Sequence, residues 1–234
     1  MTDIEYLKKY LPSSQLEEGI VKLSQGIPVQ YIVGNVDFYG NIIKVNKDVL
    51  IPRFETEELV SKTISKLKNK KNLDIVDLGT GSGCIAITLA KELDCVIDAV
   101  DISEKALQVA RQNAIDNKVN IHFYQGDMLE PLSKKYDCII SNPPYISYDE
   151  EIMEIVKKNE PHLALYANND GLEYYEKILS KVSQYIKKDG LIAFEIGYKQ
   201  AFKIQEIAHQ YLSCDVKIEK DLQGKNRFIF IHIK

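Results

Sequence analysis

The sequence of 234 residues lacks several features that mark specialised classes of protein. No apolar run approaches the roughly 20 residues that a membrane-spanning helix needs, and residues 1–5 lack the basic start and apolar middle of a signal peptide. Repeats and low-complexity tracts are absent, and the hydrophobic and charged fractions, 45% and 27%, are ordinary for a globular protein. We therefore expect a cytoplasmic protein without a membrane partner, with one sizeable core and a small appendage.

Metal-binding patterns are also missing. The cysteines form no Cys-x-x-Cys pair and lie in or beside apolar segments, and the histidines show no pairing at helical or zinc-finger spacing. Buried thiols are therefore favoured over metal ligands or disulfides, and we predict no metal site. The cysteines concerned are Cys84, Cys95, Cys138 and Cys214.

A surplus of positive charge is absent as well, because the formal net charge is −4. A protein whose main task is to neutralise many backbone phosphates needs basic surfaces, so stable nucleic-acid binding is not expected. The dense basic run at residues 66–71 is typical of the solvated C-terminal end of a helix, where lysine suits the negative end of the helix dipole.

The pattern of the first 50 residues predicts two small units. Residues 1–24 are expected to form a short helical N-terminal segment, in which Ser14 and Glu17 have the spacing of a capping box. Residues 25–50 are expected to form a β-hairpin linker. Its two β-prone runs are residues 31–33 and 42–45.

Beyond residue 50 the chain alternates apolar strands with amphipathic helices. This alternation predicts an α/β domain over 51–234, with a mostly parallel sheet of seven strands covered by helices on both faces. Only a short turn at Gly224 joins the last two strands, so they should pair antiparallel. Strands are predicted at 73–78, 95–100, 120–124, 137–141, 191–196, 215–219 and 227–233. Helices are predicted at 55–68, 84–93, from 103 onward, at 175–186 and at 202–211.

A glycine-rich segment, Asp77-Leu78-Gly79-Thr80-Gly81-Ser82-Gly83, joins the first strand of this sheet to a helix. Its glycines let the backbone bend sharply and approach a ligand closely, which favours a nucleotide-like cofactor. Residues 81–86 also satisfy the Gly-x-Gly-x-x-Ala form of the dinucleotide fingerprint, which is weak evidence alone. Asp101 ends the second strand and can accept hydrogen bonds from the ribose of NAD or of an adenosyl cofactor; otherwise it is a helix N-cap or turn residue.

The tetrapeptide Asn142-Pro143-Pro144-Tyr145 follows the fourth strand. Proline pushes the preceding residue to extended backbone and has no N–H, so the segment presents mainly acceptors. The Asn142 side-chain oxygen and the Pro143 carbonyl can together accept two hydrogen bonds from one planar NH2 group, and Tyr145 can cover its face. A tight turn after a strand is the alternative, because Asn-Pro and Pro-Pro are ordinary turn dipeptides.

In combination, the acidic residue before the glycine loop and the Asn-Pro-Pro-Tyr segment at the same edge of the sheet resemble the S-adenosylmethionine-dependent methyltransferases that modify planar amino or amide nitrogens. Further motifs narrow the resemblance to the peptide chain release factor glutamine methyltransferases, over roughly residues 24–234. These motifs are Gly26-Ile27-Pro28-Val29-Gln30-Tyr31, Phe38-Tyr39-Gly40, Leu50-Ile51-Pro52-Arg53-Phe54-Glu55-Thr56-Glu57, Asn159-Glu160-Pro161, Asp170-Gly171-Leu172 and Phe194-Glu195-Ile196-Gly197.

The resemblance implies a Rossmann-like fold, a cofactor and a substrate. S-adenosylmethionine would be converted to S-adenosylhomocysteine while a glutamine side chain of a release factor, in a Gly-Gly-Gln loop, is methylated. The glycine loop would flank the methionine part of the cofactor, Asp101 its ribose, and Asp127 and Met128 its adenine; Asp127 is otherwise a strand-end turn residue. The cofactor-binding residues so implied are Asp77, Gly79, Thr80, Gly81, Ser82, Gly83, Asp101, Asp127, Met128 and Asn142. The residues implied to bind the glutamine amide are Asn142, Pro143, Pro144 and Tyr145, with Asn142, Pro143 and Tyr145 in the catalytic role.

Two departures from the family pattern bear on this interpretation. Phe54 stands where the family usually has proline, and the N-terminal helical segment is shorter than usual. Because that segment is thought to help grip the release factor, its shortening concerns docking rather than chemistry. Arg53, Glu195 and Arg227 lie in family-like motifs, and for each an internal ion pair is the plainer role.

Two competing functions remain open from the sequence. A nucleic-acid methyltransferase acting on an exocyclic amino group of adenine or guanine would use the same planar recognition, but it must extrude the base and bind phosphates, which the acidic balance disfavours. A non-catalytic cofactor-binding protein would have no reason to keep the Asn-Pro-Pro-Tyr segment beside an intact glycine loop.

Overall fold

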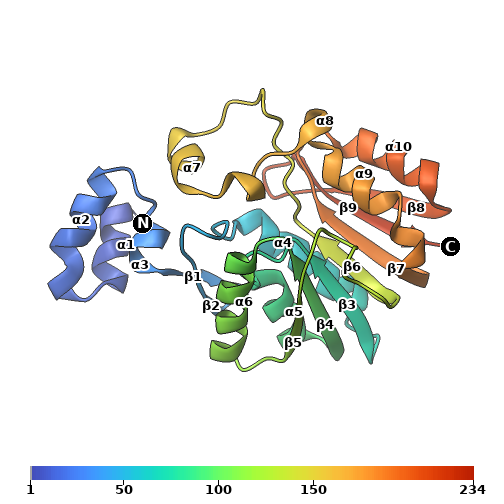
Figure 1. Cartoon of the computed structure of the whole chain (residues 1–234), viewed down its shortest axis with the longest axis horizontal. Helices are drawn as coiled ribbons and strands as arrows, with labels where there is room; N and C mark the ends of the chain where they lie inside the picture. The colour runs from blue at the N-terminus through green and yellow to red at the C-terminus, as the bar shows by residue number, and fades with distance from the viewer. Residues whose placement is uncertain (1) are drawn as a thin grey trace.

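The computed structural model of the protein describes residues 2–234. A seven-stranded sheet forms its centre, and a small helical unit with a two-stranded hairpin lies at one end (Figure 1). The strand order is β5-β4-β3-β6-β7-β9-β8, and only β9 runs antiparallel to its neighbours. The strands are β3 (Leu73–Leu78), β4 (Cys95–Asp101), β5 (Ile121–Gln125), β6 (Tyr136–Ser141), β7 (Ile186–Glu195), β8 (Cys214–Lys220) and β9 (Asn226–Ile233). The predicted fold class, with seven strands and one antiparallel strand, is confirmed.

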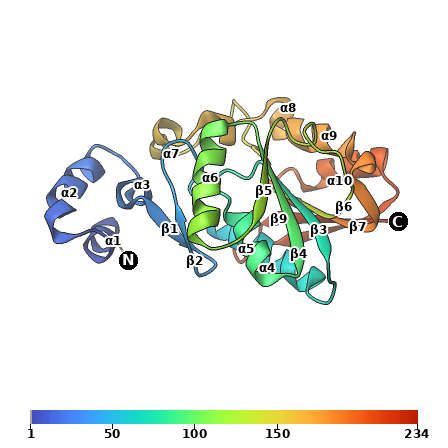
Figure 2. The same cartoon turned by 60° about the horizontal axis from the view of Figure 1, so that its bottom comes forward.

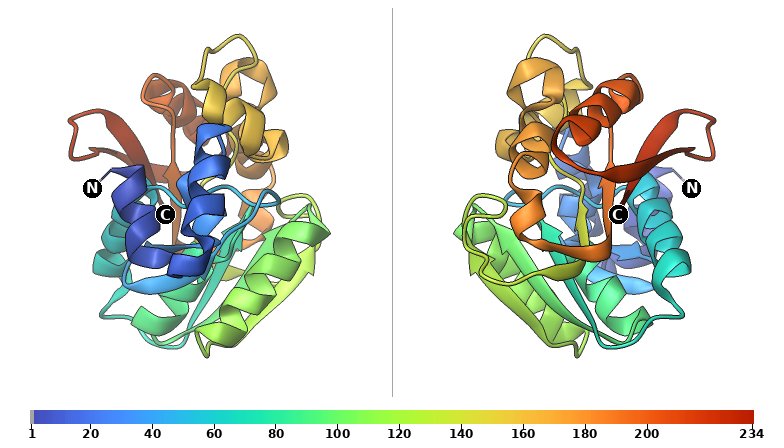
Figure 3. Two further views of the ribbon diagram at one scale, coloured as in Figure 1. Left: turned by 90° about the vertical axis from the view of Figure 1, so that its left-hand side faces the viewer. Right: turned by 90° about the vertical axis from the view of Figure 1, so that its right-hand side faces the viewer.

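Helices cover both faces of this sheet (Figures 2 and 3). Successive side chains of a strand point to opposite faces, so Ile75 of β3 packs with one group of helices while Val76 and Leu78 pack with the other. The first group comprises α4 (Phe54–Leu67), α5 (Cys84–Glu92) and α6 (Glu104–Asp116). The second group comprises α9 (Glu173–Leu179) and α10 (Ala201–Tyr211).

The N-terminal unit departs from the sequence prediction in two places. The capping box forms between Thr2 and Glu5, whereas Ser14 lies in a short 3-10 turn, η1 (Ser13–Gln15). Residues 31–33, predicted as a strand, belong to a helix that Pro28 precedes and that ends at Gly34, where φ is +83°. The elements are α1 (Asp3–Tyr10), α2 (Leu16–Ser24), α3 (Val29–Val33), and a hairpin of β1 (Asn35–Phe38) and β2 (Asn41–Lys44).

The helix predicted at 175–186 is shorter than expected. It ends at Leu179, a 3-10 turn, η3 (Val182–Gln184), follows, and Ile186 already begins β7. Ile186 pairs with Tyr136 of β6, so its side chain is buried through the sheet and not through a helix face.

An irregular segment links β6 to α9. It contains α7 (Glu154–Asn159), a 3-10 turn η2 (His162–Ala164) and the short turn α8 (Asn168–Gly171). Buried Glu160 anchors it, accepting hydrogen bonds from the Ile51 backbone N–H (3.1 Å) and the Arg53 guanidinium (2.5 Å). This contact brings together two of the motifs that the sequence places far apart.

The four cysteines are free; three are buried and Cys95 is partly buried, as predicted for thiols in the core. Within residues 2–234, no helix has both the length and the apolar character needed to cross a membrane.

Candidate active site

A cavity opens at the carboxyl edge of the sheet, where parallel strands place the residues that follow them. Several predicted site residues share it, and they come from the segments after β3, β4, β5 and β6. The predicted residues that line the cavity are Gly79, Gly81, Asp101, Asp127, Met128, Asn142 and Pro144.

The glycine loop and Asp101 hold each other in place. One carboxylate oxygen of Asp101 accepts from the Gly81 backbone N–H (2.8 Å) and the other from the Ser103 N–H (2.9 Å). Ser103 in turn caps α6 through Ala106. Burial raises the pKa of Asp101, and these backbone donors oppose the rise. The carboxylate therefore organises the loop while its remaining lone pairs are available to a ligand.

Other residues of the loop support it without lining the cavity. A Cβ atom on Gly83 would lie 3.2 Å from the Cβ of Ala110, so glycine allows the start of α5 to pack closely against α6. The backbone carbonyl of Ser82 accepts a hydrogen bond from the Asn113 side chain (2.9 Å). The Thr80 hydroxyl donates to Asp77 (2.6 Å).

Asp77 is a fully buried carboxyl at the base of this loop. Its Oδ2 accepts the Thr80 hydrogen bond, whereas its Oδ1 is buried and has no hydrogen-bond partner among residues 2–234. Burial raises the pKa of Asp77 to about 7, and the nearby charge of Asp101 adds to the rise. A buried carboxyl with an unsatisfied oxygen favours a positively charged group nearby.

Asp127 and Met128 follow β5 and line one side of the cavity. Asp127 makes an ion pair with Lys177 of α9. Met128 is almost buried and adopts φ of +54°, a strained conformation for a side chain of its size. Its thioether methyl lies beside Gly79 on the cavity wall, where its polarizable surface can contact a flat ring in the cavity.

Thr56 of α4 holds the Asn142 side chain, and Glu195 of β7 holds Thr56 in turn. The Asn142 side-chain NH2 donates to the Thr56 hydroxyl (3.1 Å), and that hydroxyl donates to Glu195 (2.7 Å). The Tyr145 hydroxyl reaches the other oxygen of Glu195 (3.4 Å). Pro143 is buried, and neither Pro143 nor Tyr145 lines the cavity, although both lie directly beside residues that do.

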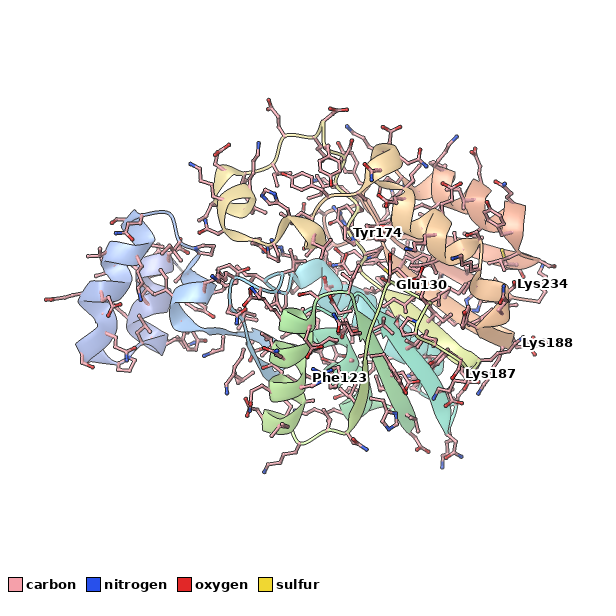
Figure 4. All side chains as sticks on the ribbon, in the orientation of Figure 1. Phe123, Glu130, Tyr174, Lys187, Lys188 and Lys234 are labelled. Carbon is pink, nitrogen blue, oxygen red and sulfur yellow. The ribbon has the colours of Figure 1, made fainter. Side chains whose placement is uncertain are left out.

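The sequence did not predict a large part of the cavity wall. Five groups of residues from separate parts of the chain supply it, including Tyr174 of α9, which Figure 4 shows near the centre of the view. The additional residues are Asp48, Val49, Leu50, Ile102, Ser103, Ala106, Gly126, Pro161, Leu163, Ala164 and Tyr174. The motifs containing Leu50 and Pro161 were available as signals, whereas nothing local marks Tyr174.

Internal ion pairs were expected for Arg53, Glu195 and Arg227, and they form for the two arginines. Arg53 pairs with Glu160, and Arg227 pairs with Asp221 (3.2 Å). Glu195 instead accepts hydrogen bonds from hydroxyl groups, and burial raises its pKa to about 7.

The donor set fits S-adenosylmethionine. The buried, incompletely bonded Asp77 favours a cation, Asp101 retains acceptors for a diol, and Met128, Leu163 and Tyr174 offer apolar surface for an aromatic base.

Comparison with known proteins agrees with this geometry. Residues 58–165 match the family model of the methyltransferase small domain. A release factor glutamine methyltransferase of Bacillus subtilis is 45% identical over 216 residues, which cover 88% of this chain and 75% of that protein. One of Streptococcus pneumoniae is 43% identical over 221 residues, covering 92% and 78%.

Solved structures share the fold at lower identity. A methyltransferase from Pyrococcus furiosus superimposes with a TM-score of 0.64 at 20% identity, covering 84% of this chain and 90% of that one. The 16S rRNA N2 G1207 methyltransferase of Thermus thermophilus, solved with AdoMet and guanosine, also gives 0.64, at 13% identity and with 86% and 50% coverage. At these identities the likeness concerns the Rossmann-like methyltransferase fold alone.

Proposed function

The chain belongs to the release factor glutamine methyltransferases, and we propose that Asn142 and Pro143 hold the glutamine amide that it methylates. The enzyme is an S-adenosylmethionine-dependent N-methyltransferase that acts on a glutamine side chain of peptide chain release factors. The observation that carries the assignment of Asn142 is its position on the cavity wall with its NH2 group already bonded to Thr56.

Different cavity residues contact different parts of the cofactor. The glycine loop approaches the ligand with its backbone, Asp101 accepts from the ribose hydroxyls, and Asp127 and Met128 contact the adenine. Asp77 contributes negative charge from below the loop. When bound, S-adenosylmethionine supplies a methyl group carried on a positively charged sulfonium.

Asn142 and Pro143 act on the substrate nitrogen by accepting its two hydrogens. An amide nitrogen is a poor nucleophile because its lone pair is delocalised, so positioning and electrostatics must supply most of the rate enhancement. The Asn142 Oδ1 and the Pro143 carbonyl draw electron density toward the nitrogen and stabilise the positive charge that develops as it is methylated. Tyr145 fixes the plane of the amide, and the extra proton leaves to solvent afterwards.

The charge around the cavity supports a protein substrate over a nucleic acid. The largely exposed segment between Tyr148 and Glu154 carries four acidic side chains, which outnumber the single lysine, Lys157, in the depression that the segment lines. Phosphates would be repelled there, whereas a neutral or basic protein loop would be accepted. The acidic residues are Asp149, Glu150, Glu151 and Glu154. Because a release factor acts at the ribosome, we place the enzyme in the cytoplasm.

The parts of the chain take separate roles in this proposal. Residues 51–234 form the methyltransferase domain, residues 25–50 link it to the N-terminus, and residues 1–24 contribute to docking. The contact between Glu160 and the Ile51–Arg53 motif supports placing residues 48–53 at the site.

Methyl transfer from labelled S-adenosylmethionine to a release factor tests the proposal, with structured RNA as the competing acceptor. The wild-type protein should label the release factor at a glutamine and leave the RNA unlabelled. Asn142→Ala should lower kcat by about 10²–10³-fold, as removal of one preorganised polar group does, with a smaller effect on cofactor affinity. Wild-type turnover by this variant would sink the assignment of Asn142.

A further inference from the structure

A chain of hydrogen bonds runs from the cavity wall into the core. It starts at the Asn142 NH2 after β6, passes through the hydroxyl of Thr56 in the first turn of α4, and ends at the carboxylate of Glu195 at the end of β7. Thr56 is 3% exposed and Glu195 is 1% exposed. Neither residue lines the cavity, so any effect on substrate must pass through Asn142.

While Glu195 is ionised, the hydrogen bonds that link Asn142, Thr56 and Glu195 can run in only one donor-to-acceptor direction. An ionised carboxylate can only accept, so the single hydroxyl hydrogen of Thr56 must point to Glu195. Only lone pairs of Thr56 then remain for Asn142, and only the NH2 end of the Asn142 amide can use them. No donor among residues 2–234 reaches the Asn142 Oδ1, which stays available as an acceptor.

We infer that Thr56 and Glu195 are positioning residues that fix the Asn142 amide with its oxygen toward the substrate. The inference rests on the role proposed above for Asn142. If the order of the chain were reversed, Thr56 would donate to the Asn142 oxygen, and the Asn142 NH2 would face the glutamine NH2. Two donors cannot hydrogen-bond to each other, so the hydrogen bond between Asn142 and the substrate nitrogen would be lost.

Protonation of Glu195 permits that reversal, because a protonated carboxyl can donate to Thr56. Burial raises the pKa of Glu195 to about 7, and Glu55 adds to the rise, while the bonds from Thr56 and Tyr145 and the charge of Arg227 oppose it. The other titratable groups facing Glu195 are Cys84 and Tyr175, which burial keeps uncharged. The amide is therefore held in the productive order above neutral pH, and kcat should rise as pH increases through about 7.

Three variants on one helix test the positioning role. Thr56→Val removes the hydroxyl and keeps the shape; we expect kcat to fall about 10–100-fold while the Kd of S-adenosylmethionine is unchanged. Thr56→Ser restores the hydroxyl and should stay within about fivefold of wild type, because only a buried methyl group is lost. Thr63→Val is the matched control: Thr63 is also buried on α4, and its hydroxyl bonds only to the Leu59 carbonyl.

Nuclear magnetic resonance gives a readout that needs no release factor. The Asn142 NH2 signals, identified by their absence in Asn142→Ala, should titrate with a midpoint near pH 7 in the wild-type protein and lose that titration in Thr56→Val. They should keep it in Thr63→Val. In Glu195→Gln, kcat should rise less than in the wild-type protein as pH increases through about 7, because the neutral amide does not titrate and only Asp77 still does.

The outcomes separate this inference from the proposed function. The positioning role would be overturned if Thr56→Val kept the wild-type kcat. It would also be overturned if the Asn142 signals changed neither with pH nor in Thr56→Val, even if release factors are methylated. Failure of the wild-type enzyme to methylate release factors would overturn the substrate assignment, while the magnetic resonance titration would still report on the hydrogen-bond chain.

Discussion

At the scale of single residues, the buried carboxyl of Asp77 lies beneath the cofactor loop. Its ionisation there lowers the free energy of unfolding. Its Oδ1 has no partner in the described part of the chain, and burial raises its pKa to about 7 from an ordinary value of 3.8. The folded state therefore binds the Asp77 proton more tightly than the unfolded state does. The resulting contribution to stability is fully present below about pH 3.8 and is lost as pH rises through about 7.

The variant Asp77→Asn removes this titration. Its melting temperature relative to that of the wild-type protein should increase between about pH 5 and pH 7 and level off above, because only the wild-type protein loses the contribution of Asp77 in that range. Thermal unfolding without cofactor, followed at a series of pH values, measures the difference. A difference that stays constant with pH would show that Asp77 does not titrate in this way.

Site residues could be predicted from the sequence when they lie at the carboxyl end of a predicted strand. Asp101 ends one buried strand and Asn142 follows another, and parallel strands bring those positions to one edge of the sheet. Thr56 and Tyr174 could not be predicted in this way, because their place depends on how α4 and α9 pack against the sheet. The hydrogen-bond chain to Glu195 has no signature in local spacing, since Thr56 and Glu195 are 139 residues apart.

At the scale of elements, the turn α8 fixes the path of the Asn-Pro-Pro-Tyr segment. Gly171 has φ of +78°, and a Cβ atom there would lie 2.0 Å from the Tyr145 carbonyl oxygen. That same oxygen accepts a hydrogen bond from Gln200 (2.9 Å), which also bonds the Asp170 carbonyl. The turn and the substrate segment therefore cannot move independently.

Alanine at Gly171 should displace Tyr145 and destabilise the protein. The matched control is Gly224→Ala, because Gly224 has φ of +81° and a Cβ atom there would meet nothing within 4 Å, so this variant bears only the backbone cost. We expect that control to lose about 1–2 kcal/mol and Gly171→Ala to lose at least about twice as much, with kcat falling too. Equal melting temperatures for the two variants would contradict the steric argument.

Elements were predictable where periodicity and local signals agreed. Helices α4, α5, α6 and α10 and the strands of the sheet formed close to their predicted positions, except that β7 begins at Ile186 and not at Leu191. Residues 31–33 are β-prone, yet Pro28 precedes and Gly34 ends a helix there, so these local start and stop signals outweighed β-propensity. Phe54 occupies the first position of α4, where the family's proline is also tolerated, and its exposed side chain leaves the core unaffected.

At the scale of the whole molecule, the helical N-terminal unit projects from one end of the body (Figures 1 and 2). The Asn159 side chain donates to the Gly26 carbonyl (2.8 Å), which ties this unit to the segment whose Pro161 and Leu163 line the cavity. On α2 of this unit, Ile20 and Val21 are 39% and 54% exposed.

If α2 helps to dock the release factor, the double variant Ile20→Ser and Val21→Ser should raise KM for the release factor by about 3–10-fold, as expected when roughly 1 kcal/mol of interface binding is lost. Neither kcat nor the Kd of S-adenosylmethionine should change, because α2 lies outside the cavity wall. Ile115→Ser on α6 is the control, since Ile115 is 68% exposed and belongs to a different surface. Steady-state kinetics with intact release factor measures all three quantities. An unchanged KM in the double variant would confine recognition to the cavity and the acidic segment of residues 149–154.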